Sequence, residues 1–244
     1  MVRGISVEGE HQIRVQSPGE TGNYKGNSML KRDYILSMVE HLAQFIARVV
    51  FLRETNRGDS AIAEIDEFYQ KVFEHDARTI RTMPHQDVVA LCVSDGLLDH
   101  QRSVALASVL KEEGDILALQ GYMEGAGDCY TRSLVLLLAT YGAGTEALPL
   151  GTVQTLELVV DRALGHEMPA AVTLDLLHYF EGNGLYADAE NLLYELIDDG
   201  TPGAAEEGVA FYQRLLRKDD QDLADGDLPR AEVEEGLAAL LKGG

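Results

Sequence analysis

The sequence contains no tryptophan and few aromatic residues of any kind. Aromatic residues make up 7% of its 244 positions, whereas hydrophobic residues as a whole make up 45%. A core of this composition must be built mainly from Leu, Ala, Val and Ile. Because such side chains suit closely packed helices, the shortage of aromatic residues favours a helical protein.

Cysteine is also scarce, and the histidines are scattered. The two cysteines, Cys92 and Cys129, lie in apolar helical stretches and outside any CxxC or Cys/His metal spacing. We therefore expect buried free thiols in a reducing compartment. None of the seven histidines lies in an HxxxH or HExxH pattern. The sequence predicts no metal site and no cofactor.

Basic residues are few compared with acidic ones. Lys and Arg number 20 against 41 Asp and Glu, so the formal net charge is −21. A field of this sign repels phosphate backbones and anionic lipid, which argues against nucleic acid and membrane surfaces as partners. A basic peptide or protein is easier to accommodate. The simpler alternative is that the acidic excess only keeps the protein soluble.

Long apolar runs are missing as well. The longest strongly apolar run, Leu134 to Ala139, is far too short to span a bilayer. Residues 1–28 lack the apolar stretch of a secretory signal, so we expect a cytoplasmic protein. They are rich in Gly, Ser and Glu and lack helical periodicity, apart from a candidate short hairpin at 4–15. We expect a disordered extension, with Met29 as the hypothetical native start.

From Asp33 onward the apolar residues recur with helical period. A small-residue segment at 142–150 is the best candidate boundary between two helical lobes, 29–142 and 151–244. We expect 79–85 to be a connection and 219–227 to be an acidic linker. The expected helices after the first one are 59–75, 86–94, 99–119, 122–141, 152–164, 170–181, 186–198, 204–218 and 230–242.

Two stretches, 110–138 and 173–201, fit one helix-turn-helix template. Glycine allows a tight turn in each, a small residue sits at the helix crossing, and large residues fill the space around it. We assign these packing roles to Gly121, Ala126, Tyr130, Gly184, Tyr186, Ala189 and Leu193. The frames lie 63 residues apart and are not tandem. The expected fold is therefore all-α, an irregular tetratricopeptide-like solenoid of antiparallel helix pairs.

Three segments carry a resemblance to a known family. They are Arg32 to Glu40 at the start of the first helix, Leu106-Ala107 followed by Glu112 to Ile116, and Tyr186 to Leu196. Over about residues 29–218 the chain resembles an uncharacterised bacterial family of tetratricopeptide-like helical proteins. The resemblance implies a helical fold and an interaction role, and it supplies no catalytic residues.

The remaining candidates for chemistry are weak. The acidic run 219–227 invites a calcium reading, but with Gly226 at the sixth loop position Leu223 falls at the third, where a carboxylate is needed. A solvated linker is preferred. No phosphate loop, nucleophile elbow or paired-carboxylate arrangement is present. We therefore expect no catalytic residues and no enzyme.

The leading functional hypothesis is a non-enzymatic module that binds a protein or peptide, preferably a basic one. In the tetratricopeptide geometry the helix 170–181 would expose Asp175, His178 and Tyr179 toward the partner. The first alternative is a structural homodimer assembled through the first amphipathic helix. The second alternative is an enzyme with a site between the lobes near 142–151, which no motif supports.

Overall fold

The computed structural model describes residues 41–143, 148–149 and 151–243. The range Leu42–Gly244 forms one compact unit. The expectations for residues 1–28, for a start at Met29 and for the beginning of the first helix concern positions outside the described residues.

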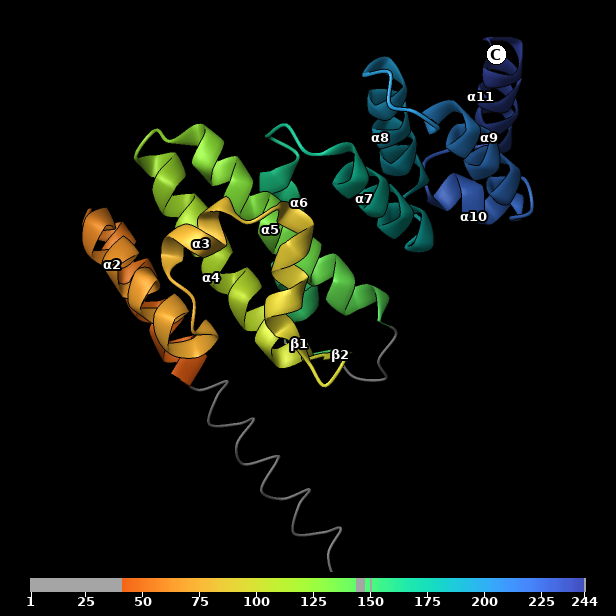
Figure 1. The fold of residues 1–244 in the computed structure, drawn as a ribbon. Helices are drawn as coiled ribbons and strands as arrows, with labels where there is room; N and C mark the ends of the chain where they lie inside the picture. Colours follow the sequence, from red (N-terminus) through yellow and green to blue (C-terminus); the bar gives the residue numbers. More distant parts are fainter. Residues whose placement is uncertain (1–40, 144–147, 150, 244) are drawn as a thin grey trace, which may run out of the picture. The chain divides into compact units, whose positions relative to one another are not determined.

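The described part of the chain is predominantly helical (Figure 1), which confirms the all-α prediction. A helix over 41–54 leads into α2 (Gly58–Phe68), a π-helix (Tyr69–Phe73), α3 (Ala77–Thr82) and a 3-10 helix (His85–Cys92). A short hairpin, β1 (Val93–Ser94) and β2 (Leu97–Leu98), precedes the remaining helices. These are α4 (His100–Leu119), α5 (Met123–Gly142), α6 (Thr152–Ala163), α7 (Ala170–Gly182), α8 (Tyr186–Asp198), α9 (Ala204–Leu215), α10 (Asp220–Asp225) and α11 (Arg230–Gly243).

Several local predictions were wrong. The expected connection 79–85 overlaps α3, whose N-cap, Asp76, accepts a hydrogen bond from the Thr79 amide. The acidic linker contains α10, capped in the same way by Asp219. An acidic side chain at the N-terminal end of a helix accepts hydrogen bonds from the free amide groups of the first turn. A run of aspartates can therefore begin a helix.

The third error concerns 86–94, where a helix was expected. The helix has 3-10 geometry and ends at Cys92. It is followed by two antiparallel strands, in which Val93 pairs with Leu98 and Ser94 pairs with Leu97. Asp95 and Gly96 lie between these strands with positive φ angles of 52° and 77°. An Asp-Gly pair in this conformation forms the tight turn that the twist of two-residue hairpins requires. This turn signal is local and lies in the sequence itself.

The π-helix at Tyr69–Phe73 interrupts a helix that was expected to run unbroken over 59–75. Both Tyr69 and Phe73 are buried at this point, and Glu74 ends the segment with a left-handed backbone. The wider helical turn changes which side chains face the core. It places the Tyr69 hydroxyl within reach of a carboxylate on α4, as described below.

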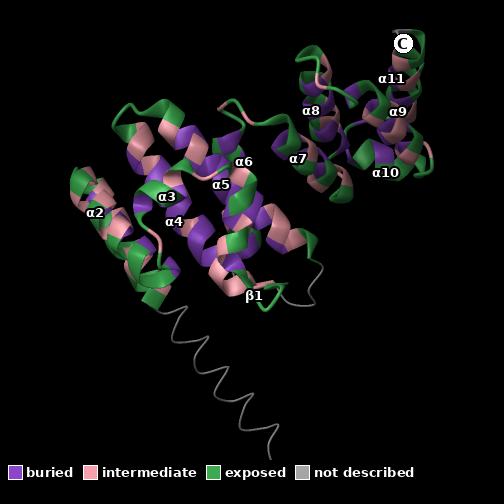
Figure 2. Cartoon of the chain, in the orientation of Figure 1, coloured by how far each residue is buried: buried purple, intermediate pink, exposed green. Residues whose placement is uncertain are grey.

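Helices α4 and α5 form an antiparallel hairpin with the largest share of buried residues, shown in purple in Figure 2. Gly114 permits their close approach, because a Cβ atom there would lie 2.6 Å from Cε1 of Tyr130. Ala126 is fully buried. The helix pair α7 and α8 repeats this packing, with Ala189 and Leu193 fully buried and Tyr186 nearly so.

The turns of the two hairpins share the same backbone hydrogen bonds. Gly121 and Gly184 have positive φ angles of 85° and 77°. The residue after each glycine donates its amide to a carbonyl five residues back, Tyr122 to Leu117 and Leu185 to Phe180, both at 2.9 Å. Glycine adopts this left-handed conformation without a steric penalty. Both turns therefore have the geometry for which glycine was expected.

Candidate functional site

A groove of about 530 Å³ lies along α5 and α7, and it contains all three residues expected to contact a partner. Asp175, His178 and Tyr179 come from one face of α7, since they are three and four residues apart. The 3-10 helix contributes Gln86 and Val89. The rest of the lining comes from Val135, Leu138, Ala139, Tyr141, Gly142, Gly182 and Asn183.

An aromatic pair forms one wall of this groove. The rings of Tyr141 and Tyr179 meet edge to face, with centroids 5.0 Å apart and planes 83° apart. The Tyr141 hydroxyl donates to Asn183 Oδ1 at 2.7 Å, and Asn183 Nδ2 donates to the Tyr179 carbonyl at 2.7 Å. Burial raises the pKa of Tyr179 above its ordinary value. The two rings thus form a fixed apolar surface, and the Tyr141 hydroxyl is already engaged by Asn183.

The outer rim of the groove is polar and carries one acid, Asp175. Asp175 and His178 are exposed, and His178 Nε2 lies 3.1 Å from Glu207 Oε1. Arg214 on α9 binds both carboxylate oxygens of Glu181, at 2.7 and 2.8 Å, and Glu207 at 2.7 Å. Burial opposes the charge of Glu207, but hydrogen bonds from Arg214 and His178 outweigh it and lower the pKa. Glu207 therefore stays ionised beside the rim.

The groove combines apolar walls with a polar rim. Apolar walls remove water from an apolar group, and the exposed carboxylate of Asp175 attracts a cationic one. The second alternative, an enzyme site near 142–151, falls partly outside the described residues, at 144–147 and 150. Across the described ranges, no three His, Cys, Asp or Glu side chains cluster so as to hold a metal ion.

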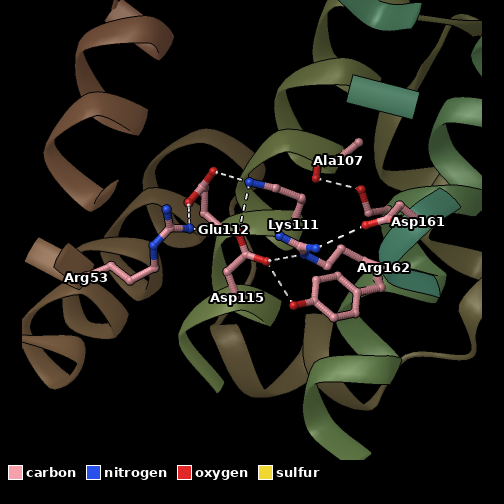
Figure 3. A network of polar contacts seen from close by, with 9 residues as sticks. Arg53, Ala107, Lys111, Glu112, Asp115, Asp161 and Arg162 are labelled. Carbon is pink, nitrogen blue, oxygen red and sulfur yellow. Dashed lines mark hydrogen bonds and ion pairs between the residues drawn. The ribbon is translucent and has the colours of Figure 1, made fainter. Parts of the chain in front are cut away.

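A network of charged side chains, which the sequence analysis did not predict, surrounds α4 (Figure 3). Arg53 Nη1 donates to Glu112 at 2.6 Å and to Asp115 at 2.7 Å. Lys111 Nζ contacts the same two acids at 2.8 and 2.9 Å. On α6, Arg162 Nε donates to Asp115 at 3.2 Å. The network ties the helix 41–54 and α6 to α4.

Glu113, the neighbouring residue, is fully buried and belongs to a separate set of contacts. It accepts a hydrogen bond from the Tyr69 hydroxyl at 2.6 Å and another from Arg81 Nε on α3. Arg81 also donates to Asp66 at 2.6 Å. Burial, together with the Glu113 charge, raises the pKa of Tyr69 well above its usual range. The tetratricopeptide pattern has Leu directly before the glycine that corresponds to Gly114, so an acid at position 113 is a signal that the sequence offers.

The two cysteines are free and buried, as the sequence predicted. Burial raises the pKa of Cys92 to about 12 and that of Cys129 well above its ordinary value. Because the thiolate is the reactive form, these side chains are inert in the folded protein.

The described helices are all too short or too polar to be candidates for crossing a membrane. Helical hairpins, a groove along α5 and α7 and a partly buried ionic network characterise this all-α protein. The chain belongs to DUF6483, a family of unknown function, whose profile matches residues 29–243. Comparisons with curated proteins and with solved structures gave no match.

Proposed function

We propose that this protein is a non-enzymatic interaction module that holds a basic peptide segment of a partner protein in the groove along α5 and α7. The observation that supports this proposal most directly is the composition of the groove. Apolar side chains and the Tyr141–Tyr179 pair form its walls, while Asp175 lies exposed at its rim. Such a surface suits a segment with alternating apolar and cationic side chains.

The proposed architecture is an irregular tetratricopeptide-like stack of helix pairs. The recurrence of the same turn at Gly121 and Gly184, with matching hydrogen bonds 63 residues apart, supports it. So does the burial of Ala126 and Ala189 at equivalent positions. Repeats of this kind commonly present a continuous binding surface, which agrees with the proposed role. A cytoplasmic location is part of the same proposal.

Photo-crosslinking tests the partner at the groove. A benzophenone amino acid at Gln86, which lines the groove, should capture a partner in the cell of origin, whereas the same group at exposed Asn191 on α8 should not. The double variant Asp175→Lys plus Tyr179→Ala should abolish the Gln86 product, and high salt should weaken it. Identical products at both positions, or an undiminished product in the double variant, would refute the groove proposal.

A defined probe separates charge from apolarity. A fluorescent peptide of alternating Lys and Leu should bind the full chain, whereas its Glu-Leu counterpart should not. If both peptides fail and the only crosslinks join two copies of this chain, the homodimer alternative replaces the groove proposal. A monomeric mass in solution would exclude that alternative.

A further inference from the structure

A second hollow, of about 480 Å³, is lined by residues of the 41–54 helix, α4, α5 and α6 and by His166 after α6. Arg53, Asp115, Tyr130, Arg162 and His166 contribute polar groups to its lining. Ala118, Leu119 and Met123 contribute apolar ones. Its volume falls in the range of small-molecule sites. None of its residues lines the groove that the proposed function uses.

The carboxylate in this pocket has no capacity left for a ligand. Asp115 Oδ1 accepts from the Tyr130 hydroxyl at 2.9 Å and from Arg162 Nε at 3.2 Å. Oδ2 accepts from Arg53 at 2.7 Å and lies 2.9 Å from Lys111 Nζ. Two carboxylate oxygens offer about four acceptor positions, and protein donors fill them.

Donor groups, in contrast, remain available. Arg53 uses only Nη1 for its contacts with Glu112 and Asp115, so Nε and Nη2 have no acceptor among the described residues. Arg162 uses Nε and Nη1, for Asp115 and Asp161, which leaves Nη2 without one in the same part of the chain. The unused hydrogen-bonding capacity of the charged side chains in the pocket is therefore for an acceptor.

The local charge also favours an anion. Arg53, Lys111 and Arg162 converge on two carboxylates, Glu112 and Asp115, that are at most 11% exposed. The third acid of the network, Asp161, is 75% exposed, so water and salt screen its charge. The local charge at this pocket is therefore positive, whereas the net charge of the whole chain is −21.

Apolar side chains stand beside these donors. Leu119 is 74% exposed and Met123 is 53% exposed, on either side of the turn between α4 and α5. An isolated exposed apolar side chain is ordinary. Here, however, both residues line the same hollow as the two guanidinium groups. A ligand that covered them would bury apolar surface while its charged end met the arginines.

We propose that this pocket binds a small organic monocarboxylate with an apolar tail. The carboxylate accepts from the free N–H groups of Arg162 and Arg53, and the tail covers Leu119 and Met123. A neutral ligand of the same length leaves these donors unpaired, and a cationic one is repelled by them. The proposal is independent of the groove and of any partner there.

Calorimetric titration of the full chain with octanoate tests this site, with octanol and octylamine as matched neutral and cationic probes. Octanoate should bind with a stoichiometry of one per chain, whereas octanol and octylamine should not bind. Arg162→Gln should weaken octanoate binding by roughly tenfold or more, since a charge-assisted hydrogen bond is lost. Arg217→Gln removes the same charge at an exposed position outside the pocket and should leave binding unchanged.

A second variant guards against a change in folding. Met123→Glu places an acid at an exposed position of the pocket rim and should also abolish octanoate binding, with an unchanged circular dichroism spectrum. A diazirine-labelled fatty acid should label peptides that contain 118–123. The proposal is overturned if octanoate does not bind, if octanol binds equally well, or if Arg162→Gln binds octanoate like the unmodified protein.

Discussion

Single atoms determine how closely α4 and α5 approach each other. At Gly114 a methyl group would lie 2.6 and 2.9 Å from the Cε1 and Cδ1 atoms of Tyr130. Tyr130 is nearly fully buried, and its hydroxyl donates to Asp115. The ring therefore cannot move aside without breaking a hydrogen bond or opening the core.

We predict that Gly114→Ala destabilises the protein by about 1–3 kcal/mol, the usual cost of inserting a methyl group into a packed interface. Urea unfolding followed by circular dichroism measures this change. Gly142→Ala is the matched control, because a Cβ atom there has no neighbour within 4 Å. Equal unfolding midpoints for the two variants would show that α4 and α5 move apart to accommodate the added methyl group at no cost in stability.

A second prediction at the residue scale concerns the buried carboxylate of Glu113. Glu113→Gln removes the buried charge that Arg81 contacts, while Arg81 keeps its ion pair with Asp66, so we expect a loss of about 1–3 kcal/mol. Glu67→Gln, which removes an exposed ion pair with Lys71, should leave the unfolding midpoint nearly unchanged. Urea unfolding of both variants measures the difference. A loss for Glu113→Gln no larger than for Glu67→Gln would mean that the Glu113 contacts contribute little.

Asp115 makes stability depend on acidity. Burial by itself would raise its pKa, but hydrogen bonds and charges from Lys111, with hydrogen bonds from Tyr130 and Arg162, lower it. A carboxyl whose folded pKa lies below its unfolded value of about 3.9 stabilises the protein above that pH. The contribution is lost as the pH falls through the folded pKa.

We therefore predict that Asp115→Asn is less stable than the unmodified protein at pH 7, by about 1–3 kcal/mol. The difference should shrink as the pH falls below about 4. Urea unfolding at pH 7, 4 and 3 measures it. A gap that stays constant over this range would show that the Asp115 charge is not responsible.

At the scale of elements, helix starts and turns follow local chemistry and were open to prediction. Asp99 was expected from sequence to begin a helix and accepts a hydrogen bond from the Arg102 amide at the start of α4. Helix α10 was missed because six residues carry too weak an apolar period to stand out from an acidic run. Its single fully buried side chain, Leu223, gains a packing partner only in the folded chain.

Asp219→Ala tests what maintains α10. The variant loses the side-chain hydrogen bond to the Asp222 amide, so we expect about 1 kcal/mol less stability and faster amide exchange over 220–225. Hydrogen exchange followed by mass spectrometry measures the local effect. Asp219→Asn keeps an acceptor at the same position and should exchange like the unmodified protein. If it exchanges as fast as Asp219→Ala, the helix depends on charge and not on the cap.

The candidate sites differ in how far the sequence could predict them. Asp175, His178 and Tyr179 were found together because helical spacing places them on one face. The ionic network was not found, because Arg53 and Glu112 are 59 residues apart and only tertiary packing brings them into contact. The pocket at Arg162 follows from the same packing. Periodicity predicts faces within a helix, but it does not predict which faces meet.

At the scale of the whole molecule, the excess of acidic residues opposes compactness. A net charge of −21 on 244 residues repels itself in the folded state more than in the expanded one. We predict that the thermal midpoint rises between about 10 and 200 mM NaCl, over which the screening length falls from roughly 30 to below 10 Å. Differential scanning calorimetry measures it. A midpoint that falls would show that the ion pairs outweigh the general repulsion.

The absence of tryptophan and the burial of both thiols have a practical consequence together. A thiol reagent reaches Cys92 only when the structure opens around the 3-10 helix, and it reaches Cys129 only when the structure opens around α5. The rates of alkylation at the two positions therefore report two separate opening reactions in the unmodified chain. In a protein without the usual fluorescent reporter, its own sulfur atoms measure where the fold opens first.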